Sequence, residues 1–418
     1  MRLKLSQIRF FALIAAVIVV SFASGWWARE NGVRLRPDGP QGPINRIVPE
    51  GKDVDFSLFW EVWDRIEAGY FDKEKINSQK MILGAIEGMV ASLGDPYTVF
   101  LPPDEQKRTQ EDLGGEFEGV GLQLGFKGTQ LAVIAPLEET PAERAGVKAG
   151  DFILGIKDED KKLEIKNTTG LSLPDAVGAI RGRAGTKVTL VLIREGVEKP
   201  FEVEIVRAKI EVPSVKLSFV GDKQDIAHLQ LYRFGDNTNG EWDKAILNIK
   251  NPSFAKATEG GQKSKGLILD LRNNPGGYLN GAVIIASEFL PRGVVVIQED
   301  GKKTRQEFKV TGKARLADIP LVVLVNGGSA SASEIVAGAL RDQGRAKIIG
   351  EKTFGKGTIQ EAQQLDSSGL HITTARWLTP NGTWVNDGPG LVPDTEAEDK
   401  SDTEEDEQLE KAIEELIK

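Results

Sequence analysis

The sequence predicts a multidomain α+β protein, because three kinds of pattern follow one another along its 418 residues. Apolar residues at helical spacing dominate the chain before about residue 113. Short strand-like runs bounded by turn residues then extend to about residue 208. From residue 225 onward, continuous apolar runs alternate with helical segments, which is typical of a buried sheet covered by helices. A chain of this length can form two or three hydrophobic cores.

Composition limits the classes of function. The chain is 40% hydrophobic and 28% charged, which is ordinary for a globular protein. Its formal net charge is −9, and the segment 394–418 alone holds twelve acidic residues against three lysines. The rest is therefore near neutral, so nucleic-acid binding has no electrostatic support. Cysteine is absent and His228 and His371 are the two histidines, so we expect no metal and no cofactor.

The N-terminus has the pattern of a membrane anchor. Three basic residues precede an uncharged run from Phe10 to Trp27, which is just long enough to span a bilayer. We expect residues 1–28 to be a signal anchor in the cell membrane, with the rest of the chain on the extracytoplasmic side. Cleavage as a signal peptide, at weak patterns such as 23–25, is the alternative. The Gly- and Pro-rich stretch 29–50 is expected to be a linker.

The region 51–113 is predicted to be helical. Phe59, Val62 and Ile66 repeat at helical spacing, and the run 81–90 has the pattern of a second amphipathic helix. The next region, 114–208, is predicted to be a small β-rich domain. Its strands are expected to form two hairpins, one of 120–124 with 131–134 and one of 188–192 with 201–206. One helix, at 173–180, is expected between the hairpins.

The region 209–398 is predicted to be the largest domain. Its buried strands are expected at 266–270 and 321–325, and a helix at 332–341. The polar, Gly-rich segment 251–265 is interpreted as a surface insertion. The tail 399–418 is acidic and is expected to end in a short amphipathic helix, whose apolar face would comprise Leu409, Ile413, Leu416 and Ile417.

A serine-rich loop, Gly327–Glu334, joins a predicted buried strand to a helix. Small residues allow a substrate carbonyl to approach the backbone, and the free N–H groups at a helix start can stabilise an oxyanion. Ser331 is therefore a candidate nucleophile. The alternative is that Ser331 or Ser333 is only the N-cap of the helix.

A nucleophilic serine needs a base. Lys356 lies between Gly355 and Gly357, and burial away from carboxylates would lower its pKa enough to let it act as one. Gln360 could orient its amine without adding charge. The alternative is a solvated loop lysine.

If a histidine were the base in place of Lys356, the protein would be a His-dependent serine protease. His228 and His371 both lie in strand-like contexts, and neither has an obvious carboxylate partner in the sequence. We therefore interpret both as sheet residues.

A second Gly-rich loop follows the first buried strand, at Asp270–Gly277. The backbone N–H of Gly276 or Gly277 could pair with that of Ala332 to form an oxyanion hole. A simple tight turn would use the same glycines.

Together these segments resemble the C-terminal processing peptidases, also called tail-specific proteases. The resemblance covers nearly everything after residue 54. Its motifs occur in the family's order, at Phe59–Trp63, Gly84–Met89, Leu93–Thr98, Asp270–Gly277, Ser329–Glu334 and Phe354–Gly357. It implies an N-terminal helical segment, a PDZ domain at 114–208 and a crotonase-like α/β protease core.

The resemblance also implies a serine endopeptidase that cleaves exported proteins through an acyl-enzyme. Ser331 would be the nucleophile and Lys356 the base, with Gln360 assisting. Ala332 and a glycine of the Asn-Pro-Gly-Gly turn would be the oxyanion donors. The insertion and the acidic tail depart from the usual pattern but lie outside the motifs.

The implied PDZ domain would bind an apolar substrate C-terminus, with the carboxylate on the N–H groups of Gly119, Val120, Gly121 and Leu122. Arg181 could couple this domain to the active site. Protein substrates and the membrane are the expected partners, and an activator, an adaptor protein or a homo-oligomer is left open. The alternative function is a catalytically idle PDZ adaptor that holds C-terminal tails at the membrane.

Overall fold

The computed structural model describes Trp26 and residues 54–137, 139–194, 196–250, 264–388, 390–398 and 405–418. The chain divides into two compact units, 1–82 and 83–418, and each is described by itself. Apart from Trp26, the expected anchor and linker lie outside the described residues, as does the expected insertion up to residue 263. Within the described ranges, no helix combines the length and the apolar character that crossing a bilayer requires.

The predicted helical region 51–113 is mostly helical in the structure, but residues 99–101 form a strand that the sequence analysis did not predict. It contains α2 (Ser57–Gly69), the short 3₁₀ helix η1 (Lys73–Lys75) and α3 (Ser78–Ala91), which crosses the boundary between the units. In the second unit, β1 (Val99–Leu101) and α4 (Pro103–Gly114) follow. Pro103 opens α4 where a missing N–H costs nothing, and Gly115 ends it in the left-handed conformation with φ 69°.

The predicted β-rich domain has both expected hairpins, since β3 pairs with β4 and β7 with β8. Its helix α6 (Leu173–Ile180) has the predicted bounds, and the N-cap Ser172 accepts a hydrogen bond from the Asp175 N–H. The main sheet has the order β3-β4-β5-β7-β8, with β6 beside β5, and β2 pairs separately with β9. The elements are β2 (Glu116–Gly119), β3 (Leu122–Lys127), β4 (Gln130–Pro136), α5 (Pro141–Arg144), β5 (Phe152–Asp158), β6 (Leu163–Ile165), β7 (Lys187–Ile193), β8 (Phe201–Val206) and β9 (Ala208–Glu211).

The largest domain is built on a sheet of order β10-β11-β12-β15-β16-β19. From β11 to β19 the neighbouring strands are parallel, and β10 is antiparallel at one edge. The predicted strands β12 (Gly266–Asp270) and β15 (Leu321–Val325) are buried along their whole length. The other strands are β10 (Val215–Val220), β11 (Ile226–Leu231), β16 (Lys347–Gly350) and β19 (Thr395–Glu396).

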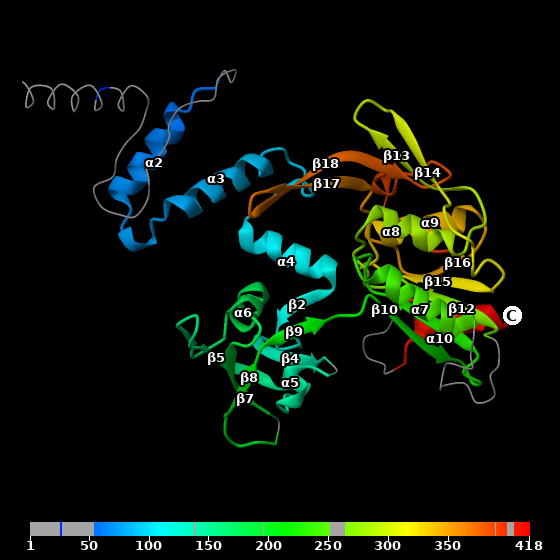
Figure 1. The fold of residues 1–418 in the computed structure, drawn as a ribbon, viewed down its shortest axis with the longest axis horizontal. Coiled ribbons are helices and arrows are strands. Elements are labelled where there is room, and N and C mark those ends of the chain that lie inside the picture. The colour runs from blue at the N-terminus through cyan, green and yellow to red at the C-terminus, as the bar shows by residue number, and fades with distance from the viewer. Residues whose placement is uncertain are drawn as a thin grey trace, which may run out of the picture. The chain divides into compact units, whose positions relative to one another are not determined.

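Helices cover both faces of this sheet (Figure 1). Leu267 and Leu269 of β12 pack with α7 (Thr238–Lys250), α8 (Leu279–Ser287) and α9 (Ala332–Asp342). Ile268 points to the other face and packs with α10 (Glu407–Ile417). The side chains that α10 contributes are Leu409, Ala412, Ile413 and Leu416, whereas the predicted face residue Ile417 is 70% exposed.

A second sheet of order β1-β18-β13-β14, with β17 also beside β18, completes the domain. Its remaining strands are β13 (Val294–Asp300), β14 (Arg305–Lys309), β17 (Thr358–Leu365) and β18 (Ser368–Leu378), and the 3₁₀ helix η3 (Val385–Asp387) follows. Trp377 of β18 is fully buried, and its indole N–H donates to the backbone oxygen of Lys356 at 2.8 Å. This sheet therefore fixes the backbone of the candidate base.

Candidate active site

The candidate residues gather where parallel strands end. The chain leaves β11, β12, β15 and β16 at the same edge of the sheet, because neighbouring pairs of these strands are parallel. The loops that follow them contain Phe234, Gly276, Ser331 and Lys356 in turn. Open α/β sheets bind ligands at this edge.

Ser331 has a strained backbone between β15 and α9. Its φ of 53° and ψ of −112° lie outside the regions that residues with a side chain usually adopt. Such strain persists only where the surrounding structure enforces it, and it occurs at nucleophiles placed on strand-to-helix turns. Ser331 is also the N-cap of α9. The two interpretations left open by the sequence, a candidate nucleophile and a helix N-cap, therefore apply to the same residue.

Exposure separates Ser331 from its neighbouring serines. Ser329 and Ser333 are completely buried, and their hydroxyls donate to the backbone oxygens of Leu271 at 2.8 Å and Asn274 at 2.7 Å. Ser331 is only partly buried. It is therefore the serine of this loop that a substrate can reach.

Lys356 is partly buried, so the alternative of a solvated loop lysine is wrong. Its Nζ lies 5.1 Å from the centre of the Tyr97 ring. Burial lowers the pKa of the Lys356 amine, although the carboxylates of Glu334 and Asp95 act in the opposite direction. The expectation of burial away from carboxylates is therefore wrong, and the lowered pKa results from desolvation outweighing two negative charges.

Glu334 joins the two candidate catalytic segments, a role that the sequence did not reveal. Its side chain is completely buried, and one carboxylate oxygen accepts hydrogen bonds from the backbone N–H groups of Ser331 at 2.8 Å and Lys356 at 3.0 Å. The other oxygen accepts from the Thr353 hydroxyl at 2.5 Å and the Gly355 N–H at 2.7 Å. Burial raises the pKa of the carboxyl, and these four donors oppose that rise. The Ser-x-x-Glu spacing of a capping box was the available signal.

The Ser331 hydroxyl and the Lys356 amine share no hydrogen bond within the described part of the chain. Among the described residues Gln360 is not hydrogen-bonded to the amine either, and its side-chain NH₂ group donates to the hydroxyls of Thr358 at 2.9 Å and Thr373 at 3.1 Å. Catalytic hydrogen bonds are often long in structures without substrate, and the missing bond between Ser331 and Lys356 is consistent with that pattern.

The Gly-rich turn after β12 lies directly against Ser331. A Cβ added to Gly276, whose φ is 99°, would stand 2.9 Å from the Ser331 Cβ and 3.0 Å from the Ala332 nitrogen. The Gly276 N–H donates to the Asn274 side chain at 2.9 Å, so it is occupied. For Gly277 and Ala332, no hydrogen bond of the N–H is found among the described residues. These two N–H groups are therefore the better candidates for oxyanion donors.

Asn274 fixes this turn and was not anticipated from the sequence. It is fully buried, and its amide donates to the Leu231 backbone oxygen at 2.6 Å. Its own backbone oxygen accepts from the Ala330 N–H and the Ser333 hydroxyl. One residue thus ties the Gly-rich turn to both the β11 end and the serine loop.

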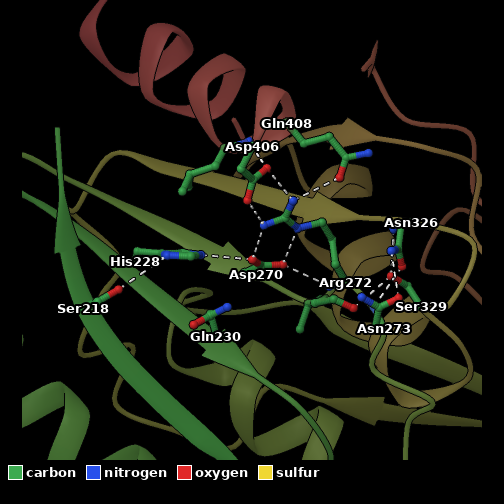
Figure 2. A network of polar contacts seen from close by, with 12 residues as sticks. Ser218, His228, Gln230, Asp270, Arg272, Asn273, Asn326, Ser329, Asp406 and Gln408 are labelled. Carbon is green, nitrogen blue, oxygen red and sulfur yellow. Dashed lines mark hydrogen bonds and ion pairs between the residues drawn. The ribbon is translucent and has the colours of Figure 1, made fainter. Parts of the chain in front are cut away.

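Both histidines are sheet residues, as predicted, in β11 and β18. The expectation that His228 lacks a carboxylate partner is wrong, because its Nε2 lies 3.0 Å from the Asp270 carboxylate (Figure 2). Asp270 is 42 residues away in sequence, so only the pairing of adjacent strands brings it close. His371 has a lowered pKa, caused by burial and then by the positive charge of Lys356.

The predicted peptide-binding residues line a pocket of about 230 Å³ in the β-rich domain. Val120, Gly121 and Leu122 line the pocket together with Val177 of α6. Gly119 is not part of the lining, although its neighbour Phe117 is. The remaining lining residues are Gln123, Leu124, Leu137, Ile180 and Arg181.

Removing the Asp95 charge is expected to shift the pH dependence of any activity that needs a neutral Lys356. The Asp95 carboxylate raises the pKa of Lys356, so Asp95→Asn should lower that pKa and move the acidic limb of kcat/KM to lower pH. Asn keeps an acceptor for the Tyr97 N–H. The pH profile should be compared with that of Asp104→Asn, which removes an exposed charge in α4. An unchanged or alkaline-shifted limb in Asp95→Asn would contradict the assignment of Lys356 as base.

Two family models match the chain. Residues 225–397 match peptidase family S41, and residues 48–105 match the N-terminal domain of the activating protease CtpB. The first match contains Asp270, Ser331 and Lys356, and the second covers much of the helical region.

Curated relatives extend over most of the chain. A carboxy-terminal-processing protease of Bartonella bacilliformis is 39% identical over 80% of this chain and 73% of its own length. The carboxy-terminal processing protease CtpA of Bacillus subtilis is 35% identical over 94% of this chain and 78% of its own length. Among solved structures, a photosystem II D1 C-terminal processing protease is 31% identical, covers 82% of this chain and 92% of its own, and has a TM-score of 0.47. The chain therefore belongs to peptidase family S41 and is a serine peptidase of the carboxy-terminal processing type.

Proposed function

We propose that this peptidase cleaves exported proteins whose apolar C-termini bind its PDZ domain, with Ser331 as nucleophile and Lys356 as general base. One observation carries the assignment. The partly buried Ser331 has a strained backbone, and the buried Glu334 carboxylate binds its N–H and that of the desolvated Lys356 together. A nucleophile and a base held by one rigid group are suited to acyl transfer.

In the proposed reaction, the Ser331 hydroxyl oxygen attacks the peptide carbonyl carbon and its proton passes to the neutral Lys356 amine. The carbonyl oxygen becomes an oxyanion that accepts hydrogen bonds from the N–H groups of Ala332 and Gly277. Protonated Lys356 then gives its proton to the leaving amine as the C–N bond breaks, which leaves an ester on Ser331. Water attacks the ester carbon as Lys356 takes one of its protons. Lys356 then gives this proton to the Ser331 oxygen as the ester C–O bond breaks, which releases the new C-terminus and restores both residues.

Substrate is expected to bring the amine and hydroxyl into contact, since they share no hydrogen bond without it. Gln360 would assist by accepting a hydrogen bond from the Lys356 amine on its side-chain oxygen, while its NH₂ group donates to the Thr358 and Thr373 hydroxyls. Its place in β17, four residues after Lys356, supports this assignment. The Gly276 N–H would keep its bond to Asn274 and so hold the turn rather than bind the oxyanion.

The groove between β3 and α6 is the proposed site for the substrate C-terminus. Its terminal carboxylate would accept hydrogen bonds from N–H groups of the segment 119–122, and its last side chain would enter the apolar pocket of about 230 Å³. A pocket of this size fits a short apolar side chain and excludes a charged one by desolvation. Tail selection would therefore favour apolar residues.

Arg181 is proposed to couple the groove to the active site. It lines the groove, and its guanidinium lies 4.4 Å from the centre of the Phe117 ring. It also contacts two acidic residues at the end of α4, Glu111 at 3.4 Å and Asp112 at 3.8 Å. A peptide in the groove would change the surroundings of all these groups.

The end of α4 continues this path to the Gly-rich turn. The Asp112 backbone oxygen accepts a hydrogen bond from the Arg233 side chain. The next residue, Phe234, donates its N–H to the Gly276 oxygen at 2.9 Å. Contiguous contacts therefore support a route from the groove to the proposed oxyanion turn.

The proposed location is the cell membrane, with a single N-terminal anchor and the catalytic domain on the extracytoplasmic side. The basic flank before the uncharged run 10–27 supports this orientation. An activating or adaptor protein and a homo-oligomer are compatible with it. Fractionation of cells expressing the full chain, with protease added outside or after lysis, tests both the anchoring and the side.

The function is tested with two unstructured substrates that differ only at the end, one with apolar residues and one with two aspartates. Full-length protein and its Ser331→Ala variant are incubated with each, and intact masses are followed over time. We expect cleavage that requires Ser331 and favours the apolar end. Tight binding of the apolar end by both proteins, with cleavage by neither, would support the adaptor function instead.

A charge placed in the groove should weaken substrate binding. Val177→Glu puts a carboxylate beside the site proposed for the substrate carboxylate and the last apolar side chain, so KM for the apolar tail should rise about tenfold or more. Val197→Glu, at an exposed turn outside the groove, is the matched control and should leave KM unchanged. Equal KM values for the two variants would exclude this groove as the tail site.

A further inference from the structure

The acidic tail ends in a helix that forms part of the protease core. Helix α10 covers the face of the sheet opposite α7, α8 and α9. Ala412 is fully buried there, and Leu416 lies so close to Gly266 that an added Cβ would stand 3.1 Å from it. The helix therefore completes the burial of β12 and β15.

Arg272 joins the start of α10 to the end of β12 through hydrogen bonds from its guanidinium group (Figure 2). Arg272 directs two N–H groups to the Asp406 carboxylate at 2.7 and 2.8 Å, and one to Gln408 at 3.2 Å. Its remaining two bind the Asp270 carboxylate at 3.0 and 2.7 Å. All five guanidinium donors are used, so the arginine has a single well-determined position.

Arg272 and the two carboxylates that bind it, Asp270 and Asp406, form a cluster (the arginine cluster) whose members are ionised near neutral pH. Burial would raise the pKa of Asp270, but hydrogen bonds from His228 and Arg272 outweigh it and lower the pKa. The same balance, with bonds from Arg272 and the Leu409 N–H, lowers the pKa of Asp406. Both carboxylates therefore stay ionised and keep the arginine in place.

Arg272 immediately precedes the turn that lies against Ser331. The next residue, Asn273, has a φ of 55° and exchanges two hydrogen bonds with the Asn326 side chain. The preceding residue, Leu271, accepts the Ser329 hydroxyl. A displaced Arg272 would thus move both the turn with Gly276 and Gly277 and the loop that contains Ser331.

We propose that Asp406 and Gln408, at the start of the C-terminal helix, are positioning residues for the protease, because they fix Arg272 and through it the oxyanion turn. This inference rests on the proposed role of that turn. The tail departs from the family pattern in sequence, yet it would act on one of the motifs. Its effect should fall mainly on the chemical step, because Asp406 and Gln408 are not among the residues that line the groove.

Asp406→Ser tests the proposal. Asp406 also caps α10 by accepting the Leu409 N–H at 2.9 Å, and serine retains a cap while being too short to reach Arg272. Glu415→Ser is the matched control, since it breaks the 2.5 Å pair with Lys347 at the other end of the same helix. Arg272→Lys is a second variant, which keeps the positive charge but loses the planar guanidinium group with its five N–H donors.

Full-length variants are compared at a temperature where urea titration shows them folded. We expect Asp406→Ser and Arg272→Lys to lower kcat about tenfold with KM within twofold, while Glu415→Ser retains both constants. Affinity for a peptide aldehyde should fall by the same factor as kcat/KM. In that complex the Ser331 oxygen adds to the aldehyde carbon, the serine proton passes to Lys356 and the oxyanion occupies the proposed hole.

Equal activities of Asp406→Ser and Glu415→Ser, or unchanged aldehyde affinity in both arginine-cluster variants, would overturn the proposal. Ser331→Ala is included in each series. If it is inactive while the cluster variants behave as wild type, the positioning role fails and the proposed function stands. If Ser331→Ala remains active, the proposed function itself fails.

Discussion

Ser331→Ala and Lys356→Ala are each expected to lower kcat/KM by at least about 10⁴-fold, because a dyad loses nearly all its chemistry with either member. Ser331 has the strained, accessible position at the start of α9, and the desolvated Lys356 is held by the same Glu334 carboxylate that binds the Ser331 N–H. Lys356→Arg should not restore activity, since a guanidinium does not deprotonate in proteins. Initial rates on the apolar-tailed substrate measure the effect.

The neighbouring serines are the matched controls. Ser333→Ala removes one buried hydrogen bond and Ser329→Ala removes two, each of which should cost about 1 kcal/mol of stability while Ser331 keeps its place. His228→Ala and His371→Ala should likewise retain the dyad. Loss of activity in a folded His371→Ala variant, or full activity in Ser331→Ala, would contradict the Ser–Lys assignment.

Glu334→Gln is expected to have the second largest effect. Four donors face the Glu334 carboxylate, whereas a glutamine offers one oxygen and turns an NH₂ group toward two of them. Leaving buried donors without acceptors should cost about 3 kcal/mol of unfolding free energy. Because the backbones of Ser331 and Lys356 lose their common anchor, kcat should fall about 10²-fold even where the variant is folded.

The pH dependence separates this effect from a change in the base. The Glu334 charge raises the pKa of Lys356, so its removal makes more neutral lysine available at a given pH. A fall in kcat would therefore occur despite a more available base. Thr353→Val is the control, since it removes one donor and leaves both catalytic backbone contacts. If Thr353→Val and Glu334→Gln reduced kcat equally at equal stability, the bridging role of Glu334 would be wrong.

Elements set by local patterns could be predicted from the sequence. Helix α6 has its predicted bounds because a capping serine and an apolar face define it, and β12 and β15 follow from uninterrupted apolar runs. The closeness of the Gly-rich turn to Ser331 was expected from the family resemblance and from glycines that permit tight approach. The structure supports that closeness through the space at Gly276.

Contacts between distant segments could not be predicted. Asp95 acts on Lys356 across 261 positions of sequence, and the Asp270–His228 pair depends on the register of two parallel strands. The C-terminal helix has an obvious amphipathic pattern, but nothing local indicates which sheet face its apolar side covers. These features depend on tertiary packing, which one sequence does not specify locally.

The most direct test of the central claim is to trap the acyl-enzyme. Wild-type protein is mixed with an activated ester of a short apolar peptide and quenched in acid within one turnover, and the modified residue is identified by peptide mass mapping. The account predicts an acyl group on Ser331 that forms more slowly as Lys356 is protonated and is absent from Ser331→Ala. An acyl group on Ser329 or Ser333, or an unchanged yield in Lys356→Ala, would contradict it.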